Sequence, residues 1–247
     1  NYSGTFSSTV NVTITDNDPA VVTITGGGAV NVVEGGATSS YQLNMNAASG
    51  VTATTTVSGG ANCLVSLDGI TYSATVNATL SGSALTTIYV QAIDDTVLEG
   101  AHTCTLTHTN LVSGSSVWNG VAISNVTGNV TDNESATITY TTGGSATEGG
   151  SGSGTVNLVI TANGVPNTGT LGANVTVAIT NTAGSASVSD YSVTTPSITF
   201  TSGSSSGSQS VNYTGTDDQT VEGSETFTLG FGAVTTTIST GVTASGT

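Results

Sequence analysis

The feature that most constrains this chain is an internal repeat. The stretch DDTVLEGAHTCTLTH begins at Asp94, and DDQTVEGSETFTLGF follows it without gaps 123 residues later. Upstream, VVEGG matches ATEGG, and VTGNVTDNE matches VNVTITDND near the N-terminus. A repeat of this length is the size of a domain. We therefore expect one domain over residues 19–133 and a second over 134–247, whereas residues 1–18 match only the final strand of a repeat.

Apolar and polar residues alternate along many short segments, such as TVNVTIT from Thr9 and ETFTLGF from Glu225. This period of two, in segments rich in Thr, Val and Ile, is typical of half-buried β-strands. Glycine- and serine-rich stretches at 26–28 and 202–208 indicate turns. No amphipathic helix is apparent. The sequence predicts an all-β fold of tandem antiparallel Ig-like sandwiches.

The two ends of the chain are out of phase with the repeat. Residues 134–247 have no counterpart of the strand that residues 1–18 match, so the second domain is expected to lack its last strand. Three arrangements explain this: a window of a long tandem array, a subunit that donates its N-terminal strand to a neighbour, or a chain that closes on itself. An open sandwich edge favours pairing with an added strand. The first two describe a fibre of copies joined end to end, with residues 1–15 paired to residues 225–247 of another copy.

The chain has 15 acidic residues but no Lys or Arg, for a formal net charge of −15. Without cations to neutralise phosphate, we expect no binding to nucleic acid or attraction to anionic membranes. No apolar run is long enough to insert into a membrane as a helix. Because the chain starts at Asn1 without a visible signal peptide, we interpret it as a processed piece of a longer protein.

All fifteen carboxylates fall within the repeated motifs. They are Asp16 and Asp18 near the N-terminus; Glu34, Asp68, Asp94, Asp95, Glu99, Asp132 and Glu134 in the first repeat; and Glu148, Asp190, Asp217, Asp218, Glu222 and Glu225 in the second. Clustered carboxylates without cationic partners must bind metal, share protons or stay apart. Calcium ions (Ca2+) take about 6–8 oxygen ligands. We therefore predict calcium sites at the domain joints with these residues as ligands; the alternatives are solvated turn residues or sites that have lost their metal.

These motifs resemble the Calx-β family of sodium/calcium exchangers and bacterial surface proteins. The resemblance rests on Glu34-Gly35 and Glu148-Gly149, on Asp190-Tyr191, on both DDxxxEG stretches, and on the terminal TDNE and TDND stretches. It implies a seven-stranded sandwich that binds calcium at one tip through the first-strand Glu, the mid-domain Asp, the Asp-Asp pair with its following Glu, and a terminal acidic triplet. The triplets contain Asn here, His102 replaces the counterpart of Glu225, and Asp68 is a looser match to the mid-domain Asp.

The two cysteines, Cys63 and Cys104, predict either one disulfide in an oxidising compartment or a pair of buried free thiols. Cys104 is expected to face the core. With the composition, this favours an extracellular or cell-surface location. We predict a calcium-stabilised repeat of a bacterial-type extracellular fibre or surface stalk. The alternative is an adhesin module that binds a glycan or a neighbouring cell. Trp118, on an expected exposed hairpin, is either an adhesive contact or a residue that covers a sandwich edge. No nucleophile motif or aromatic-lined carboxylate pair appears, so we expect no enzyme activity.

Overall fold

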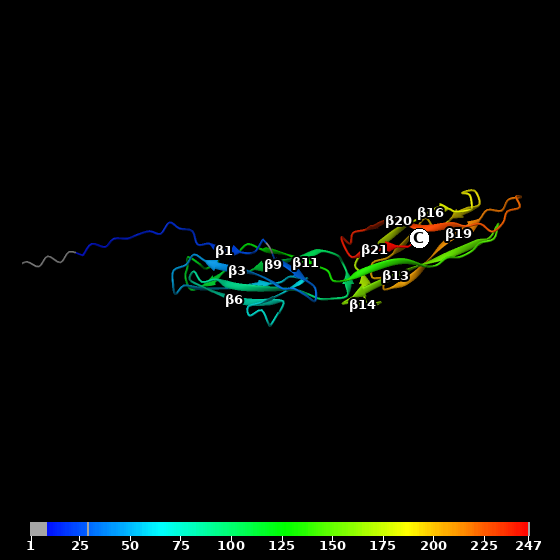
Figure 1. Cartoon of the computed structure of the whole chain (residues 1–247). Coiled ribbons are helices and arrows are strands. Elements are labelled where there is room, and N and C mark those ends of the chain that lie inside the picture. The colour runs from blue at the N-terminus through cyan, green and yellow to red at the C-terminus, as the bar shows by residue number, and fades with distance from the viewer. Residues whose placement is uncertain (1–8, 29, 247) are drawn as a thin grey trace, which may run out of the picture.

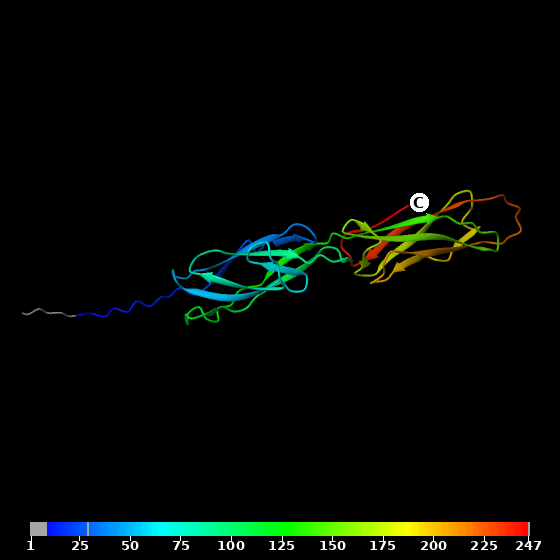
Figure 2. The same cartoon turned by 90° about the horizontal axis from the view of Figure 1, so that it is seen from below.

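The computed structural model describes residues 9–28 and 30–246, and these residues form strands and loops without any helix. Two β-structured bodies lie end to end as a rod, and the N-terminal segment extends from one end of it (Figures 1 and 2). The described residues contain no helix of the length and hydropathy that a membrane span requires. The all-β prediction is confirmed.

The first body is a sandwich of two sheets around one core. One sheet has the order β1-β3-β7-β5, and the other has the order β10-β4-β9-β11-β2 with β6 beside β4. The strands are β1 (Val22–Thr25), β2 (Val30–Val33), β3 (Ser39–Met45), β4 (Thr52–Ser58), β5 (Cys63–Ser66), β6 (Thr75–Ser81), β7 (Thr86–Ala92), β8 (Val97–Leu98), β9 (His102–His108), β10 (Val112–Ser113) and β11 (Val126–Thr131).

The second body repeats this plan with fewer strands in one sheet. Its sheets have the orders β17-β19-β13-β12-β21, with β14 beside β13, and β18-β16-β20. The strands are β12 (Ser135–Thr142), β13 (Ser151–Ala162), β14 (Val165–Pro166), β15 (Thr170–Leu171), β16 (Val175–Ala183), β17 (Tyr191–Val193), β18 (Ser197–Phe200), β19 (Gly207–Gly215), β20 (Phe227–Thr236) and β21 (Val242–Ser245).

The alternation in the sequence decides which side chains form the cores. In β3, Tyr41, Leu43 and Met45 are buried, whereas the residues between them are partly exposed. Successive side chains of a strand point to opposite faces, so one face of each strand supplies the core. Each sandwich has its own cluster of buried apolar residues.

The two sandwiches differ at one sheet edge. In the first, β11 pairs antiparallel with β9 and parallel with β2. In the described part of the second, β20 pairs only with β16, so its other edge is open. Cys104 and Leu106 of β9 are buried, whereas their counterparts Phe227 and Leu229 of β20 are only half-buried.

The N-terminal segment, residues 9–18, forms no strand and is exposed. Val10, Val12 and Ile14 are 81%, 78% and 91% exposed. The segment projects away from the second sandwich (Figure 1), so residues 9–18 do not complete the second sandwich of their own chain. Residues 1–8, which were predicted to belong to the same terminal strand, lie outside the described residues.

At the joint, the first repeat contributes a short strand to the second sandwich. Strand β8 belongs to the first repeat by sequence, but it pairs in parallel with β15 of the second sandwich. Leu98 of β8 is fully buried in the core of the second sandwich. Gly100 packs against Ser239, where a Cβ atom would lie only 2.8 Å from the Ser239 nitrogen. The loop that carries the acidic motif therefore also anchors the neighbouring sandwich.

Cys63 and Cys104 form a disulfide between β5 and β9, with their Cα atoms 5.9 Å apart. Both residues are buried, so the expectation that Cys104 faces the core is confirmed. Trp118 is only 6% exposed and packs in the first core. The exposed position expected for Trp118 is therefore wrong, and with it the adhesive contact. The segment after β10 folds back, and Trp118 covers the edge of the sandwich, which was the other alternative.

Replacing both cysteines, Cys63→Ala with Cys104→Ala, should destabilise the first sandwich. The disulfide spans 41 residues, and closing a loop of that length contributes about 4 kcal/mol through the entropy of the unfolded chain. Urea denaturation followed by the fluorescence of Trp118, the only tryptophan, should show a midpoint shifted to lower urea. An unchanged midpoint would contradict the prediction.

Candidate metal centre

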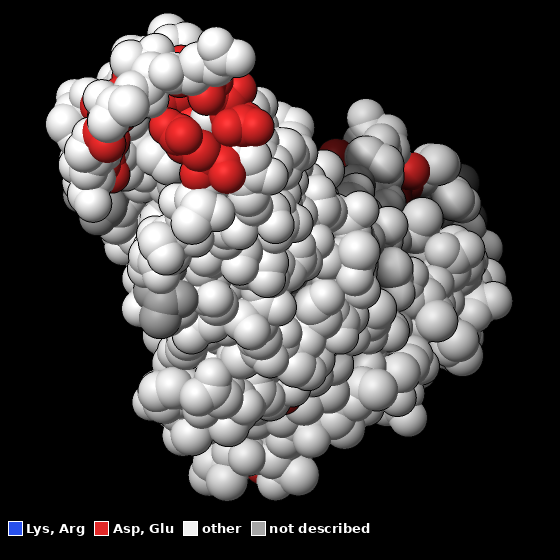
Figure 3. All heavy atoms as spheres, turned by 90° about the vertical axis from the view of Figure 1, so that its right-hand side faces the viewer, with Lys and Arg blue, Asp and Glu red and all other residues white. Residues whose placement is uncertain are grey.

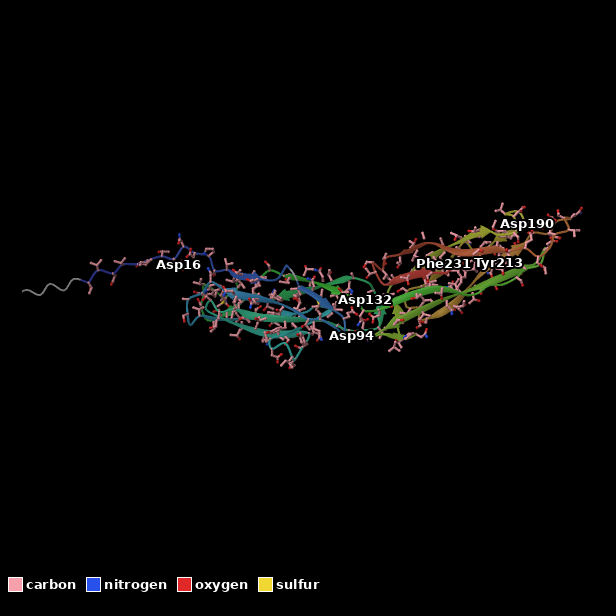
Figure 4. The ribbon with its side chains drawn as sticks, in the orientation of Figure 1. Asp16, Asp94, Asp132, Asp190, Tyr213 and Phe231 are labelled. Atoms are coloured by element: carbon pink, nitrogen blue, oxygen red, sulfur yellow. A yellow bond between two sulfur atoms is a disulfide. The ribbon has the colours of Figure 1, made fainter. Side chains whose placement is uncertain are left out.

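Acidic side chains from three segments meet at the joint. Glu34 lies in the turn after β2, Glu99 precedes β9, and Asp132 and Glu134 lie in the linker between β11 and β12. Ligand oxygens of Glu34, Asp132 and Glu134 lie within 4.8 Å of one another, and so do ligand atoms of Glu34, Glu99 and His102. The labels of Asp94 and Asp132 in Figure 4 mark this place, midway along the rod.

Asp132 is held by backbone donors. Its Oδ2 atom accepts hydrogen bonds from the amides of Glu99 and Gly100, at 2.7 and 2.5 Å. Its Oδ1 atom accepts a hydrogen bond of 2.7 Å from the amide of Glu134. These bonds bring the acidic loop of β8 against the linker.

Asn133 connects the two sandwiches. Its Nδ2 group lies within hydrogen-bond distance of the carbonyl oxygen of Glu34 and of Oδ1 of Asp94, at 3.0 and 3.1 Å. It also lies 3.1 Å from Oδ1 of Asn163, which belongs to the turn between β13 and β14. Gly35 makes room for this contact, because its φ is 59° and a Cβ atom there would lie 3.0 Å from Asn133.

Several buried oxygens at the joint have no hydrogen-bond partner among the described residues. They are Oε2 of Glu34, both carboxylate oxygens of Glu134, and Oδ1 of Asn133. Glu34 and Glu134 are each only 4% exposed. Buried polar atoms are almost always paired, and unpaired buried carboxylates are costly. Carboxylate and amide oxygens are the ligands that calcium prefers, so the residues present fit a calcium ion.

Crowding also raises the pKa values of these acids. Burial, followed by the negative charges of Asp132 and Asp95, raises the pKa of Glu34 to about 7. Burial also raises the pKa of Glu134, and the neighbouring carboxylate of Asp132 adds to it. Both shifts show that the folded chain resists a second negative charge here unless a cation or a proton balances it.

His102 is the one basic side chain at the joint. Its Nδ1 atom lies 2.9 Å from the carbonyl oxygen of Gly100, which can only accept a hydrogen bond, so Nδ1 carries a proton. Its Nε2 atom lies 3.6 Å from Glu34 and 3.8 Å from Glu99. His102 can therefore balance part of the charge when Nε2 is protonated.

A second acidic group occupies the far tip of the second sandwich. Ligand oxygens of Asp190, Glu222 and Glu225 lie within 4.8 Å of one another. Burial, with the charge of Asp190 next, raises the pKa of Glu222. Figure 3 shows carboxylates around a hollow at this end. Unlike Glu34 and Glu134 at the joint, Glu222 and Glu225 are exposed.

The fifteen predicted ligands thus separate into four places. Glu34, Asp94, Asp95, Glu99, Asp132 and Glu134 belong to the joint; Glu148, Asp190, Asp217, Asp218, Glu222 and Glu225 belong to the tip; Asp68 lies in the hairpin between β5 and β6; and Asp16 and Asp18 lie in the extended N-terminal segment.

Asp68 is held by hydrogen bonds within its own hairpin. Its Oδ1 atom accepts hydrogen bonds from the amides of Ile70 and Thr71, each 2.8 Å long, and from the hydroxyl of Ser66. These bonds lower the pKa of Asp68 to about 2. Asp68 is a turn residue and belongs to neither of the carboxylate groups. Asn163 and Leu98 at the joint were not predicted from the sequence. For Leu98 a signal was available, because both acidic loops contain an apolar residue at this position, Leu98 in one repeat and Val221 in the other.

No protein-family model matches the chain, and no curated protein is similar to it in sequence. Among solved structures, it is similar to the calcium binding domain CBD12 of CALX1.1, with 14% identity, a TM-score of 0.31, and coverage of 83% of this chain and 77% of that one. For CBD12 from CALX1.2 the values are 15%, 0.32, 86% and 80%.

A third similar structure is the CsuC-CsuE chaperone-tip adhesion subunit complex from Csu pili of Acinetobacter baumannii. The identity is 7% and the TM-score 0.31, with coverage of 92% of this chain and 100% of that one. Because all these TM-scores are low, the assignment of the fold rests on the strands and cores described above.

Proposed function

We propose that this chain is a structural, non-catalytic repeat of an extracellular fibre or surface stalk, in which calcium at the joint holds the two sandwiches in a fixed relation. The observation that carries the proposal is the set of buried, unpartnered oxygens of Glu34, Asn133 and Glu134. The chain has no Lys or Arg to neutralise them. A calcium ion is the balancing charge that suits oxygen ligands best.

The position of these ligands explains how an ion would stiffen the rod. Glu34 belongs to the first sandwich, whereas Glu134 directly precedes β12 of the second. An ion bound by both side chains ties the body of one sandwich to the first strand of the next. The acidic motifs that resemble the Calx-β family support the same ligand set. The disulfide supports a location in an oxidising compartment.

Calcium titration by calorimetry tests the proposal. The chain should bind calcium with a dissociation constant on the order of 10⁻⁶ to 10⁻³ M. Small-angle X-ray scattering should show a longer, narrower particle with calcium than with chelator. The double variant Glu34→Gln with Glu134→Gln should lose the joint site. Asp68→Asn is the matched control, because it removes a carboxylate that belongs to neither group.

Absence of calcium binding in the unmodified chain would overturn the proposal. Identical scattering with calcium and with chelator would overturn the stiffening role. Loss of binding in Asp68→Asn equal to the loss in the double variant would show that the joint is not the site.

A further inference from the structure

We propose that residues 10–15 of one copy add as a strand to the open edge of β20 in a second copy, where Asp16 and Asp18 complete the acidic group at the tip. The inference rests on the proposed fibre function and deepens it by naming the partner, which is another copy of this chain. Its evidence is the joint inside the chain, which supplies a template for a joint between chains.

The acceptor is a groove of about 1000 Å³ beside β20. Its lining includes Tyr140, residues 143–148, Tyr191 and half-buried Phe227 and Leu229. The ring of Tyr191 stacks on that of Phe227 at a centroid distance of 4.0 Å. The groove therefore combines an unpaired strand edge with apolar surface, which is what an added β-strand requires.

The donor segment, residues 10–15, has the same alternation of apolar and polar residues as β11, which fills the corresponding edge of the first sandwich. Residues 10–18 align without gaps to residues 126–134, so Val10, Val12 and Ile14 correspond to the core-facing Val126, Gly128 and Val130 of β11. Asn11, Thr13 and Thr15 correspond to the exposed residues of β11. The three apolar side chains are at least 78% exposed in the isolated chain. A strand with one apolar face and no core of its own is suited to an open sheet edge.

The register of the added strand can be taken from β11, and it accounts for the glycines at positions 128 and 144. In the first sandwich, Gly128 lies opposite Val30 of β2. The equivalent positions place Val12 opposite Gly144, so the glycine and the valine exchange sides. A Cβ atom on Gly144 would clash with the carbonyl oxygen of Ser153 and the hydroxyl of Tyr213. At this level of the groove, an apolar side chain must therefore come from the added strand.

The acidic end of the donor is already folded for its role. Asp16 Oδ1 accepts a hydrogen bond of 3.0 Å from the amide of Asp18, as Asp132 Oδ1 does from Glu134. In the joint, Asp132 Oδ2 also accepts from the amides of Glu99 and Gly100.

The counterparts of those two amides lie at the tip, at Glu222 and Gly223. They donate to no acceptor in the described part of the chain. Docking would give them Asp16 and place the carboxylate of Asp18 beside Glu222 and Glu225.

The acidic loop at the tip carries a second unmatched feature. Leu98 in the first repeat is fully buried in the next sandwich, whereas its counterpart Val221 is 101% exposed. If a second copy docks through residues 10–18, its first sandwich follows directly and can cover Val221. Donor and acceptor lie at opposite ends of the rod, as the labels of Asp16 and Asp190 show (Figure 4). Such a head-to-tail contact does not close and generates an open filament.

Light scattering and sedimentation velocity over a range of concentrations test the inference on the full chain. The unmodified chain should form end-to-end oligomers that grow with concentration. Val12→Asp with Ile14→Asp should weaken this association by about 100-fold or more, because it places charge in an apolar groove. Folding should be unaffected, since both side chains are exposed within their own chain. Ile70→Asp is the matched control, because Ile70 is 84% exposed but lies in a hairpin of the first sandwich.

A synthetic peptide of residues 9–18 should bind the Val12→Asp, Ile14→Asp chain and should cap growth of the unmodified chain. An unmodified chain that stays monomeric, even if the peptide binds, overturns the second copy as partner. Oligomers that the donor variant forms equally well also overturn it. Oligomers that persist in chelator support strand addition, and the calcium role is tested separately by titration of the monomeric donor variant.

Discussion

Leu98→Ala should lower the free energy of unfolding of the second sandwich by about 2–5 kcal/mol, although the residue belongs to the first repeat. Leu98 is fully buried among the core residues of the second sandwich. Removing its side chain leaves a cavity beside Gly241. The two residues are in close contact, since a Cβ atom added to Gly241 would lie 2.9 Å from Cδ1 of Leu98. The loss arises in one sandwich from a change in the loop of the other.

Two spectroscopic signals separate these effects. Trp118 packs in the first core, so its fluorescence reports the first sandwich alone, whereas circular dichroism reports both. In urea, the dichroism transition of Leu98→Ala should shift while the fluorescence transition stays nearly constant. Leu85→Ala, at a residue that is 58% exposed, is the matched control. A shift in fluorescence alone would mean that Leu98 stabilises its own sandwich instead.

The second large effect is on the difference in stability between the double variant and the unmodified chain, which should change sign when calcium is added. In chelator at pH 8, Glu34→Gln with Glu134→Gln should be more stable than the unmodified chain. The pKa of Glu34 rises from 4.5 to about 7 on folding, so the folded state holds more protons than the unfolded state between these values. Stability is therefore full below pH 4.5 and falls as the pH rises to about 7, by at most about 3 kcal/mol from Glu34.

Calcium should invert this order. A ligand that binds only the folded state at 100 times its dissociation constant stabilises it by about 2.7 kcal/mol. The unmodified chain should gain this stability at pH 8, whereas the double variant should not. Thermal unfolding at pH 5 and pH 8, with calcium and with chelator, measures the stability of each of the two chains under these conditions. Asp68→Asn should respond to calcium like the unmodified chain. A double variant that is less stable in both solutions would contradict the prediction.

Most strand positions could be predicted from the sequence because burial on one face imposes a period of two. Residues 9–15 alternate in the same way but form no strand, because no sheet edge lies beside them. The prediction was wrong where the chain turns back on itself. Trp118 lies in a short segment without alternation, so the sequence left open whether it makes an adhesive contact or covers a sandwich edge. The role of Leu98 was not predictable from periodicity either, since β8 has only two residues and pairs across the joint.

The candidate site was predictable in its composition but not in its grouping. Carboxylate motifs that recur at fixed spacing had to meet at equivalent loops, which brought Glu34 near Asp132. Asp68 was only a looser match to the mid-domain Asp190, but the sequence did not show whether other carboxylates lie near it. Only the three-dimensional arrangement shows that the partners of Asp68 are the amides of Ile70 and Thr71 and the hydroxyl of Ser66.

The disulfide has a consequence for how a filament of such chains would respond to pulling. A polypeptide chain under tension lengthens when a sandwich unfolds, by about 3.3–3.6 Å for each residue released. The 41-residue separation between Cys63 and Cys104 removes roughly 140 Å of that length from the first sandwich. The second sandwich has no cysteine and can extend fully. Each chain would therefore release less length from its first sandwich than from its second when both unfold under load.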